Sequence, residues 1–339
     1  MASKLPTMRD VAQLAGVSVQ TVSHVVNHTG HISLETRDRV FKAIEQLNYR
    51  RNPIARSMRT RQTRLIALLV LDITNPVLST IASEVEAAAY AEDYNVLLYN
   101  VGQDARREQT YMETVAERLV DGLIIVNAVD REHTFALVEQ GSVPTVLIDS
   151  LAAPTIPSVS VDNFKAGYVA TQYAIELGHR RIAHISGALS LEVARQRRNG
   201  YLQAISDYQL DYQQVISPLN DRWDYQSGYR AMCDLLASDP PPTAVFAAGD
   251  QMAIGAYRAL AEAGLNVPGD ISVIGFDDIE AASYTIPPLT TIRQPLDQLA
   301  RRAFDLLLNL LDGQQPETIQ VFLEPELIVR QSTGAPRDR

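Results

Sequence analysis

The sequence predicts a small all-α helix-turn-helix headpiece followed by a larger α/β unit with parallel sheets. The length of 339 residues is sufficient for two such units. Residues 1–62 carry ten Lys/Arg and four Asp/Glu, a net charge of +6. The rest of the chain carries 20 Lys/Arg and 36 Asp/Glu, a net charge of −16, so the net charge of the whole chain is −10. Beyond residue 64, continuous apolar runs alternate with helical segments, as in parallel sheets covered by helices on both faces. A basic head on an acidic body indicates a polyanion-binding module joined to a separate partner domain.

Composition excludes several classes of protein. The single cysteine, Cys233, rules out an internal disulfide and a multi-cysteine metal site. No apolar run reaches the roughly 18 residues that a membrane-spanning helix needs, and residues 1–9 lack the apolar core of a secretory signal. We therefore expect a soluble cytoplasmic protein without a cofactor or metal.

The head is predicted to form three short helices. Thr7 and Asp10 fit a capping box for the first helix, which Gly16 ends. Ser18 caps the second helix and Ser33 the third. Each helix carries an apolar stripe for packing: Val11, Ala12, Leu14 and Ala15; Val22, Val25 and Val26; Val40, Ala43, Ile44 and Leu47. The first two helices and their tight turn form a helix-turn-helix, and the basic charge favours DNA binding over a plain three-helix bundle.

The segment TMRDVAQLAGVSVQTVSHVVN, residues 7–27, resembles the headpiece of the lactose-repressor/galactose-repressor (LacI/GalR) family. The resemblance implies that the second helix enters the major groove, where Val19, Gln20 and His24 read bases. Glutamine can bond adenine with two hydrogen bonds, and valine can pack on a thymine methyl. Most relatives have arginine in place of His24, so base preference at that position is open. The resemblance also implies phosphate contacts, compatible with helix capping, from Ser18, Thr21, Asn27 and Thr36.

The segment LNYRRNPIARSM, residues 47–58, resembles the hinge of the same family. Asn52-Pro53 is a good start for a short helix over residues 53–59, which alone in water is marginal. The resemblance implies that it folds when two copies meet in the minor groove, with Met58 as the wedge between base pairs. A disordered linker is the alternative. The expected minor-groove residues are Asn52, Ile54, Ala55, Arg56 and Met58.

The body is predicted to alternate between strands and helices. Apolar runs predict strands at 65–71, 96–99, 123–126, 145–148, 182–185, 244–247 and 271–276. Between most of them, helices are predicted at 77–91, 106–119, 165–177, 226–237 and 251–263. This alternation predicts parallel sheets with helices on both faces.

The body also resembles the effector core of the family, which has two lobes like those of periplasmic sugar-binding proteins. The resemblance divides the chain into a headpiece at 1–49, a hinge at 50–62, a core at 63–334 and a short tail at 335–339. It places crossings between the lobes near 161–163, 291–295 and 323–326. The tail has no leucine heptads, so we expect a homodimer that reads a palindromic operator.

Ligands of open parallel sheets bind beyond the carboxyl ends of the strands, where this sequence places several Asp and Arg residues. Carboxylates, guanidinium groups and one aromatic face suit a polyhydroxyl ligand. The resemblance implies effector contacts at Asp149, Val161, Arg197, Trp223, Gly249, Asp277 and Leu296. In the lactose-repressor branch, Gly249 is an asparagine and Leu296 a phenylalanine, so the pocket is expected to be roomier here. Three neighbouring residues have an interpretation other than ligand binding: Asp250 as a helix cap, Asp278 as an interlobe or loop-stabilising group and Arg195 as a surface ion-pair residue.

These features predict a sequence-specific transcriptional repressor of carbohydrate metabolism. We expect it to leave its operator when a galactoside, another glycoside or an oligosaccharide binds between the lobes. The alternative is a corepressor-dependent regulator that responds to a purine or a sugar phosphate. A purine favours aromatic stacking on both sides, and Trp223 is the one strong candidate in the sequence.

Three other classes of function were weighed. An enzyme could use Asp277 and Asp278 as a carboxylate pair, but adjacent residues leaving a strand point in different directions, and no catalytic motif is present. A sugar-transport component needs export, which the basic head and the missing signal oppose. A DNA-binding protein without any sugar response is the third alternative.

Overall fold

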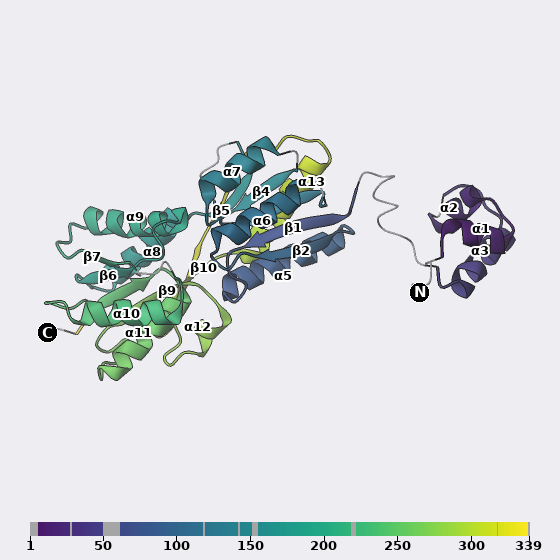
Figure 1. The fold of residues 1–339 in the computed structure, drawn as a ribbon. Coiled ribbons are helices and arrows are strands. Elements are labelled where there is room, and N and C mark those ends of the chain that lie inside the picture. The colour runs from purple at the N-terminus through teal and green to yellow at the C-terminus, as the bar shows by residue number, and fades with distance from the viewer. Residues whose placement is uncertain are drawn as a thin grey trace. The chain divides into compact units, whose positions relative to one another are not determined.

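The computed structural model describes residues 6–27, 29–49, 62–117, 119–141, 143–150, 155–217, 222–316 and 318–337. Contacts divide the chain into two units, Met1–Thr63 and Arg64–Arg339. The two units are described separately below (Figure 1).

Among its described residues, the first unit holds three helices, α1 (Met8–Ala15), α2 (Val19–Val26) and α3 (Leu34–Gln46). Thr7 and Asp10 form the expected capping box, and Gly16 has φ +63 at the end of α1. The hydroxyl of Ser18 accepts from the backbone of Thr21, as expected of the cap of α2. The helices enclose a small apolar core made of Val11, Ala12, Ala15, Val22, Val25, Val26, Val40 and Ala43. The predicted helix-turn-helix headpiece is confirmed.

The second unit contains two six-stranded sheets, each the centre of one lobe (Figure 1). Lobe 1 is built on an all-parallel sheet with the order β11-β5-β4-β3-β1-β2. Its strands are β1 (Leu65–Val70), β2 (Asn95–Asn100), β3 (Gly122–Val126), β4 (Thr145–Ile148), β5 (Ser158–Val161) and β11 (Gln320–Leu323). Helices α5 (Pro76–Ala91) and α13 (Leu296–Leu311) pack together on one face, and α6 (Ala105–Ala116) and α7 (Arg131–Gln140) on the other.

Lobe 2 is built on a sheet with the order β12-β10-β9-β8-β6-β7, in which only the edge strand β12 is antiparallel to its neighbour. The strands are β6 (Ile182–Ile185), β7 (Gln214–Ile216), β8 (Ala244–Ala247), β9 (Ser272–Asp277), β10 (Thr290–Arg293) and β12 (Glu326–Ile328). Helix α8 (Asn163–Glu176) packs against α9 (Glu192–Asp207), and α10 (Tyr225–Leu236) against α11 (Asp250–Glu262). The short helix α12 (Glu280–Tyr284) follows β9.

The chain passes between the lobes three times, after β5, after β10 and between β11 and β12. The two lobes are therefore not consecutive segments, and the last part of the chain supplies strands to both. Residues of the predicted tail lie against lobe 2, where Arg337 Nη1 donates to Asp270 Oδ1 at 3.0 Å. The predicted fold class, a helical headpiece followed along the chain by two parallel-sheet lobes, is confirmed.

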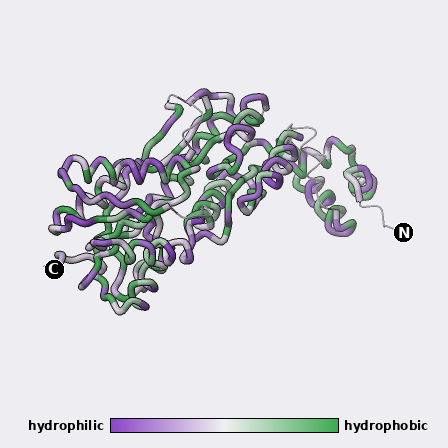
Figure 2. The backbone as a smooth tube through the Cα atoms, turned by 60° about the vertical axis from the view of Figure 1, so that its left-hand side comes forward, coloured by the Kyte–Doolittle hydropathy of each residue, from purple (hydrophilic) through white to green (hydrophobic). Residues whose placement is uncertain are grey.

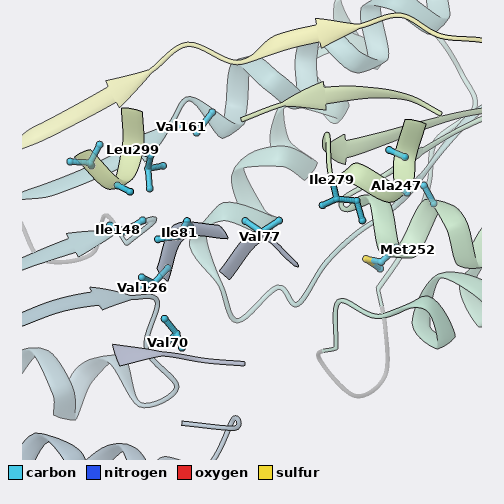
Figure 3. Close-up of a cluster of buried hydrophobic side chains, with 14 of the residues drawn as sticks. Val70, Val77, Ile81, Val126, Ile148, Val161, Ala247, Met252, Ile279 and Leu299 are labelled. Carbon is cyan, nitrogen blue, oxygen red and sulfur yellow. The ribbon is translucent and has the colours of Figure 1, made fainter. Parts of the chain in front are cut away.

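The apolar core is continuous from one lobe to the other. Figure 3 shows Val77 of lobe 1 and Ile279 of lobe 2 within one buried cluster that reaches both sheets. Along most helices in Figure 2, hydrophobic and hydrophilic residues alternate, as expected of helices with one buried side. Within the described ranges no helix is both long and apolar enough to cross a membrane.

Candidate functional site

A cavity lies between the two lobes and receives side chains from both. Lobe 1 contributes Leu71, Asp72, Thr74, Asn75, Val77, Leu78, Gln103, Asn127 and Asp149. Lobe 2 and its crossing to lobe 1 contribute Leu191, Val193, Arg197, Arg222, Trp223, Asp224, Gln251, Asp277 and Gln294. A ligand that fills the cavity would contact both lobes at once, so its binding depends on how the lobes are arranged.

Several residues that line the cavity have a positive backbone φ angle, which is unusual for residues other than glycine. Gln103, Asn127 and Asp149 have φ values of +60, +58 and +55, and Asp277 has φ +117. Each lies at or shortly after the carboxyl end of a parallel strand. Positive φ costs a non-glycine residue on the order of 1 kcal/mol or more, and such residues cluster at functional sites. The four positions together mark this edge of the lobes as the binding edge.

Arg197 is the buried charge at the centre of the site. Its side chain on α9 is 3% exposed, Nε donates to Asn163 Oδ1 at 2.7 Å, and Nη1 donates to the carbonyl of Ala248 at 2.6 Å. The guanidinium carbon lies 3.4 Å from the ring centre of Phe276, a stacking contact that holds its plane. Burial lowers the pKa of Arg197 to about 10, opposed by the neighbouring carboxylates. The guanidinium of Arg197 is therefore a charged hydrogen-bond donor that is held in one orientation.

Three carboxylates surround this single guanidinium: Asp149, Asp250 and Asp277. Burial raises the pKa of Asp149 and Asp277 above the usual range, while Arg197 lowers both. Ser160 Oγ donates to Asp149 Oδ1 at 2.9 Å, and Gln294 Nε2 donates to Asp277 Oδ1 at 2.7 Å. Asp149 also accepts from the backbone N–H of Val161, and Asp277 from the backbone N–H of Asp250, and both aspartates line the cavity.

Trp223 forms an aromatic wall of the cavity beside two glycines. A Cβ added to Gly187 would overlap the indole ring, so the ring packs directly on the Gly187 backbone. A Cβ added to Gly249 would lie 3.4 Å from Asp277 Oδ2 and 3.7 Å from Trp223 Cε3, which are ordinary contact distances. Gly249 is not among the residues that line the cavity, but it lies beside Asp277 and Trp223, which are.

Two buried polar atoms of the cavity residues have no hydrogen-bond partner within the described part of the chain. They are Nε1 of Trp223, a donor, and Oε1 of Gln294, an acceptor. Buried polar groups in native proteins are nearly always paired, so these two atoms are candidates for bonding a polar ligand of the cavity.

Two expected effector residues lie elsewhere. Val161 is fully buried on β5 and belongs to the apolar cluster on the face of the sheet that α5 and α13 cover. Leu296 is the first residue of α13 and packs against the same core. Neither side chain lines the cavity. Effector contacts at these two positions stay a prediction.

The interpretations of Asp250, Asp278 and Arg195 that do not involve ligand binding are partly right. Asp250 is not a helix cap: it is the first residue of α11, and its carboxylate accepts from Thr291 Oγ1 and from the Ile279 backbone. Asp278 accepts from Arg293 and Arg330, at 2.7 and 2.6 Å, and so stabilises its loop. Arg195 pairs with Glu192 on its own helix and donates to nearby carbonyls.

Sequence reasoning missed several polar lining residues, among them Asn127, Gln251 and Gln294. Asn127 directly follows β3, so the rule that ligands bind at strand ends could have found it. Gln294 lies in a crossing between lobes, and no local pattern distinguishes it. Within the described residues, no cluster of three or more His, Cys, Asp or Glu side chains is placed to hold a metal ion.

In the headpiece, α2 presents the expected reading residues on its exposed side. Val22, Val25 and Val26 are buried, whereas Val19 is 42% exposed and Gln20 is also exposed. His24 is half-buried, one turn beyond Gln20. An apolar side chain such as Val19, exposed beside a capped helix start, is suited to contact a base methyl group.

The expected phosphate-contact residues all take part in helix capping. Ser18 Oγ and Thr21 Oγ1 lie 2.9 Å apart, and Ser33 Oγ donates to Thr36 Oγ1 at 2.9 Å. Asn27 Nδ2 donates to the Ser23 carbonyl at 2.7 Å. The expected minor-groove residues 52–58, including the Met58 wedge, lie outside the described residues.

Comparisons with known proteins match both units. The description "Bacterial regulatory proteins, lacI family" matches residues 7–52, and "Periplasmic binding protein-like domain" matches residues 171–333. The HTH-type transcriptional repressor PurR of Erwinia tasmaniensis is 37% identical over 333 residues, which cover 97% of each chain. The chain belongs to the LacI family. It is a DNA-binding transcriptional repressor, and because its relatives are repressors, the expectation that it is not an enzyme is confirmed.

Solved structures of the LacI family share the whole fold. The Lac repressor dimer bound to operator and the anti-inducer ONPF aligns with a TM-score of 0.90 at 33% identity, over 98% of this chain and 100% of that chain. The transcriptional regulator CelR in complex with cellobiose aligns with a TM-score of 0.74 at 31% identity, over 96% and 99%. The two-lobed core of this LacI-family member is therefore the family's core.

Proposed function

We propose that the cavity between the lobes binds a neutral polyhydroxyl effector, such as a galactoside, another glycoside or an oligosaccharide. The observation that carries this proposal is the combination of Arg197, Asp149 and Asp277 with an unpaired donor and an unpaired acceptor beside one cavity. Hydroxyl groups both donate and accept, so they match such a mixed set. Trp223 supplies one aromatic face for the apolar C–H side of a sugar ring.

A purine corepressor is the alternative, and the comparisons favour it over a sugar, because relatives of 35–37% identity over nearly the whole chain are named as the repressor PurR. The relative from Erwinia tasmaniensis is named as the repressor PurR, and it matches this chain over nearly its whole length. Against this candidate, Trp223 is the one aromatic side chain among the described lining residues, so a flat base would stack on one side only. A sugar phosphate is disfavoured because four aspartates line the cavity against two arginines.

The expected mechanism is a two-state switch of the lobes. The ligand contacts both lobes, so it binds one lobe arrangement more tightly than the other and shifts their equilibrium by that difference in affinity. A sugar acting as inducer would favour the arrangement with weaker operator binding, and a corepressor would favour the opposite one. The lobe crossings after β5, after β10 and before β12 are the segments that must bend.

A titration followed by tryptophan fluorescence tests the identity of the effector. Trp223 is the only tryptophan of the chain and lines the cavity, so it reports occupancy directly. We expect a saturable fluorescence change with one class of mono- or disaccharide and none with guanine, hypoxanthine or adenine. A change with purines alone would replace the sugar by the second candidate, and glycerol at equal concentration controls for viscosity.

For DNA, we propose that α2 reads the major groove through Val19, Gln20 and His24, and that Ser18, Thr21, Asn27 and Thr36 contact phosphates. The supporting observation is the exposed face of a capped helix in a unit of net charge +6. Two copies in a homodimer would read the two halves of a palindrome. The hinge residues Asn52, Ile54, Ala55, Arg56 and Met58 remain proposed minor-groove contacts.

Replacing Gln20 with alanine is expected to relax base selection at one position of each half-site. The lost pair of hydrogen bonds should reduce discrimination at that base pair by about 1–3 kcal/mol. The measurement is selection from random duplexes followed by binding at fixed salt. Gln46→Ala, at an exposed position on α3, is the matched control. Equal losses of affinity for selected and random DNA would contradict the assignment of Gln20.

A further inference from the structure

Asn163 is a fully buried amide in direct contact with Arg197. It is the first residue of α8 and lies two residues after the end of β5, at the crossing from lobe 1 to lobe 2. Arg197 Nε donates to Asn163 Oδ1 at 2.7 Å. Arg197 is among the described residues that line the cavity, and Asn163 is not. Asn163 can therefore act on a bound ligand through Arg197.

The orientation of the Asn163 amide is fixed by two partners that each have one role. An arginine Nε only donates, so the atom facing it is Oδ1, and a backbone carbonyl only accepts, so the atom 2.9 Å from the Val161 carbonyl is Nδ2. The same Nδ2 makes a longer contact of 3.5 Å with Ser160 Oγ, which donates to Asp149 Oδ1 at 2.9 Å. Hydrogen bonds therefore run from Arg197 of lobe 2, through the crossing, to Asp149 of lobe 1.

The backbones of α8 and α9 touch beside Arg197. A Cβ added to Gly167 on α8 would lie 2.1 Å from the carbonyl oxygen of Arg197, and one added to Gly200 on α9 would lie 2.0 Å from that of Phe164. Both distances are too short for a side chain, so the two helices keep a fixed spacing at this place. A displacement of Arg197 therefore also displaces the first turn of α8, which begins at the crossing.

We propose that Asn163 is a positioning residue that holds Arg197 toward the effector through its amide oxygen and joins Arg197 to the lobe crossing through its amide nitrogen. The proposal rests on the proposed function, in which an effector contacts Arg197 and shifts the equilibrium between lobe arrangements. An effector that displaces Arg197 also displaces Asn163 against the end of β5, so a contact in the cavity changes the arrangement of the lobes. The two roles belong to two atoms, and they can be removed separately.

The experiment uses the full chain, an operator selected from random duplexes, and five probes: lactose, cellobiose, maltose, guanine and hypoxanthine. The probe that saturates the Trp223 fluorescence change of the wild type is used for all variants. Two quantities are measured: the Kd of the probe, from fluorescence, and the ratio of the operator Kd values with and without saturating probe. This ratio measures coupling between two sites, and a uniform loss of folded protein does not change it.

Asn163→Asp keeps the oxygen that faces Arg197 and removes the donor to the Val161 carbonyl. We expect its probe Kd to stay near that of the wild type and its coupling ratio to fall by about 2- to 30-fold, the usual effect of mutations between two coupled sites. Asn163→Ala removes both atoms, so its probe Kd should also rise by about tenfold or more, the loss of a hydrogen bond to a charged group.

Asn199→Ala, at an exposed position on α9, is the matched control and should keep both quantities. Circular dichroism checks that the variants fold. Asn163→Asp retains the bond to Arg197, so it tests the proposal even where Asn163→Ala does not fold.

The outcomes separate the inference from the function on which it rests. If no probe changes the wild-type fluorescence, or the effective probe leaves operator affinity unaltered, the proposed function fails and the inference falls with it. If a purine is the effective probe, the sugar is replaced and the same two quantities test Asn163 with that purine. If the wild type responds but Asn163→Asp keeps the full coupling ratio, Asn163 does not join Arg197 to the crossing. An unchanged probe Kd in Asn163→Ala would overturn the role of the amide oxygen.

Discussion

Arg197→Ala is expected to abolish the effector response and to destabilise the core by about 3–5 kcal/mol, the usual cost of leaving buried charges without their partner. The guanidinium is the shared counter-charge of Asp149, Asp250 and Asp277, and it is 3% exposed. Its removal leaves these three carboxyl groups facing one another in a buried site. Thermal or urea unfolding measures the loss of stability, and Trp223 fluorescence measures the loss of ligand binding.

Two further variants make this prediction specific. Arg195→Ala removes a neighbouring arginine of the same helix, whose partners are Glu192 and carbonyls of its own loop. It should change stability by less than about 1 kcal/mol, as is typical of exposed ion pairs. Arg197→Lys keeps the charge, so it should fold, yet it loses the fork geometry and should bind ligand more weakly. Wild-type ligand affinity in Arg197→Lys would contradict a binding role for the guanidinium.

Gly187→Ala is expected to displace Trp223 and to weaken effector binding by at least about tenfold. The added Cβ would overlap three atoms of the indole ring, so the ring must leave its present position. Overpacking of this kind typically costs about 1–3 kcal/mol. Because the chain has one tryptophan, the shift of its emission maximum reports the displacement directly.

Gly249→Ala is the matched control, because Gly249 is a second glycine beside the same indole ring. Its backbone φ of −158 is extended and open to any residue, and the added Cβ finds ordinary contact distances to Asp277 and Trp223. We expect it to keep the fold and the position of Trp223 and to alter ligand preference only modestly. If Gly187→Ala bound ligand as tightly as Gly249→Ala, Trp223 would not be a wall of the binding site.

Most of the fold could be predicted from local patterns. The caps at Thr7, Ser18 and Ser33 mark helix starts because an oxygen side chain must satisfy free backbone N–H groups there. The long apolar runs correctly predicted the central strands, such as β1 and β3. Strands β5 and β12 have only four and three residues, and β5 reads Ser-Val-Ser-Val, so hydrophobicity alone could not identify them.

The site could be predicted only in part, because it is made by tertiary contact. Asp149, Arg197, Trp223 and Asp277 do line one cavity, but Val161 and Leu296 do not. A buried valine on a strand can face a ligand or a covering helix, and the pattern of the surrounding residues does not distinguish the two cases. The role of Gly187 depends on Trp223, which is distant in sequence, so no local pattern could show it. The contact of Asn163 with Arg197 likewise joins two helices, α8 and α9.

The most direct test of the central claim is operator affinity measured with and without the ligand that changes Trp223 fluorescence. We expect a saturating sugar to weaken binding of the selected operator by about 5- to 150-fold, the usual range of coupling between two sites, and Arg197→Lys to reduce this effect. A sugar that saturates the fluorescence change but leaves operator affinity unaltered would contradict the claim that the cavity between the lobes controls DNA binding.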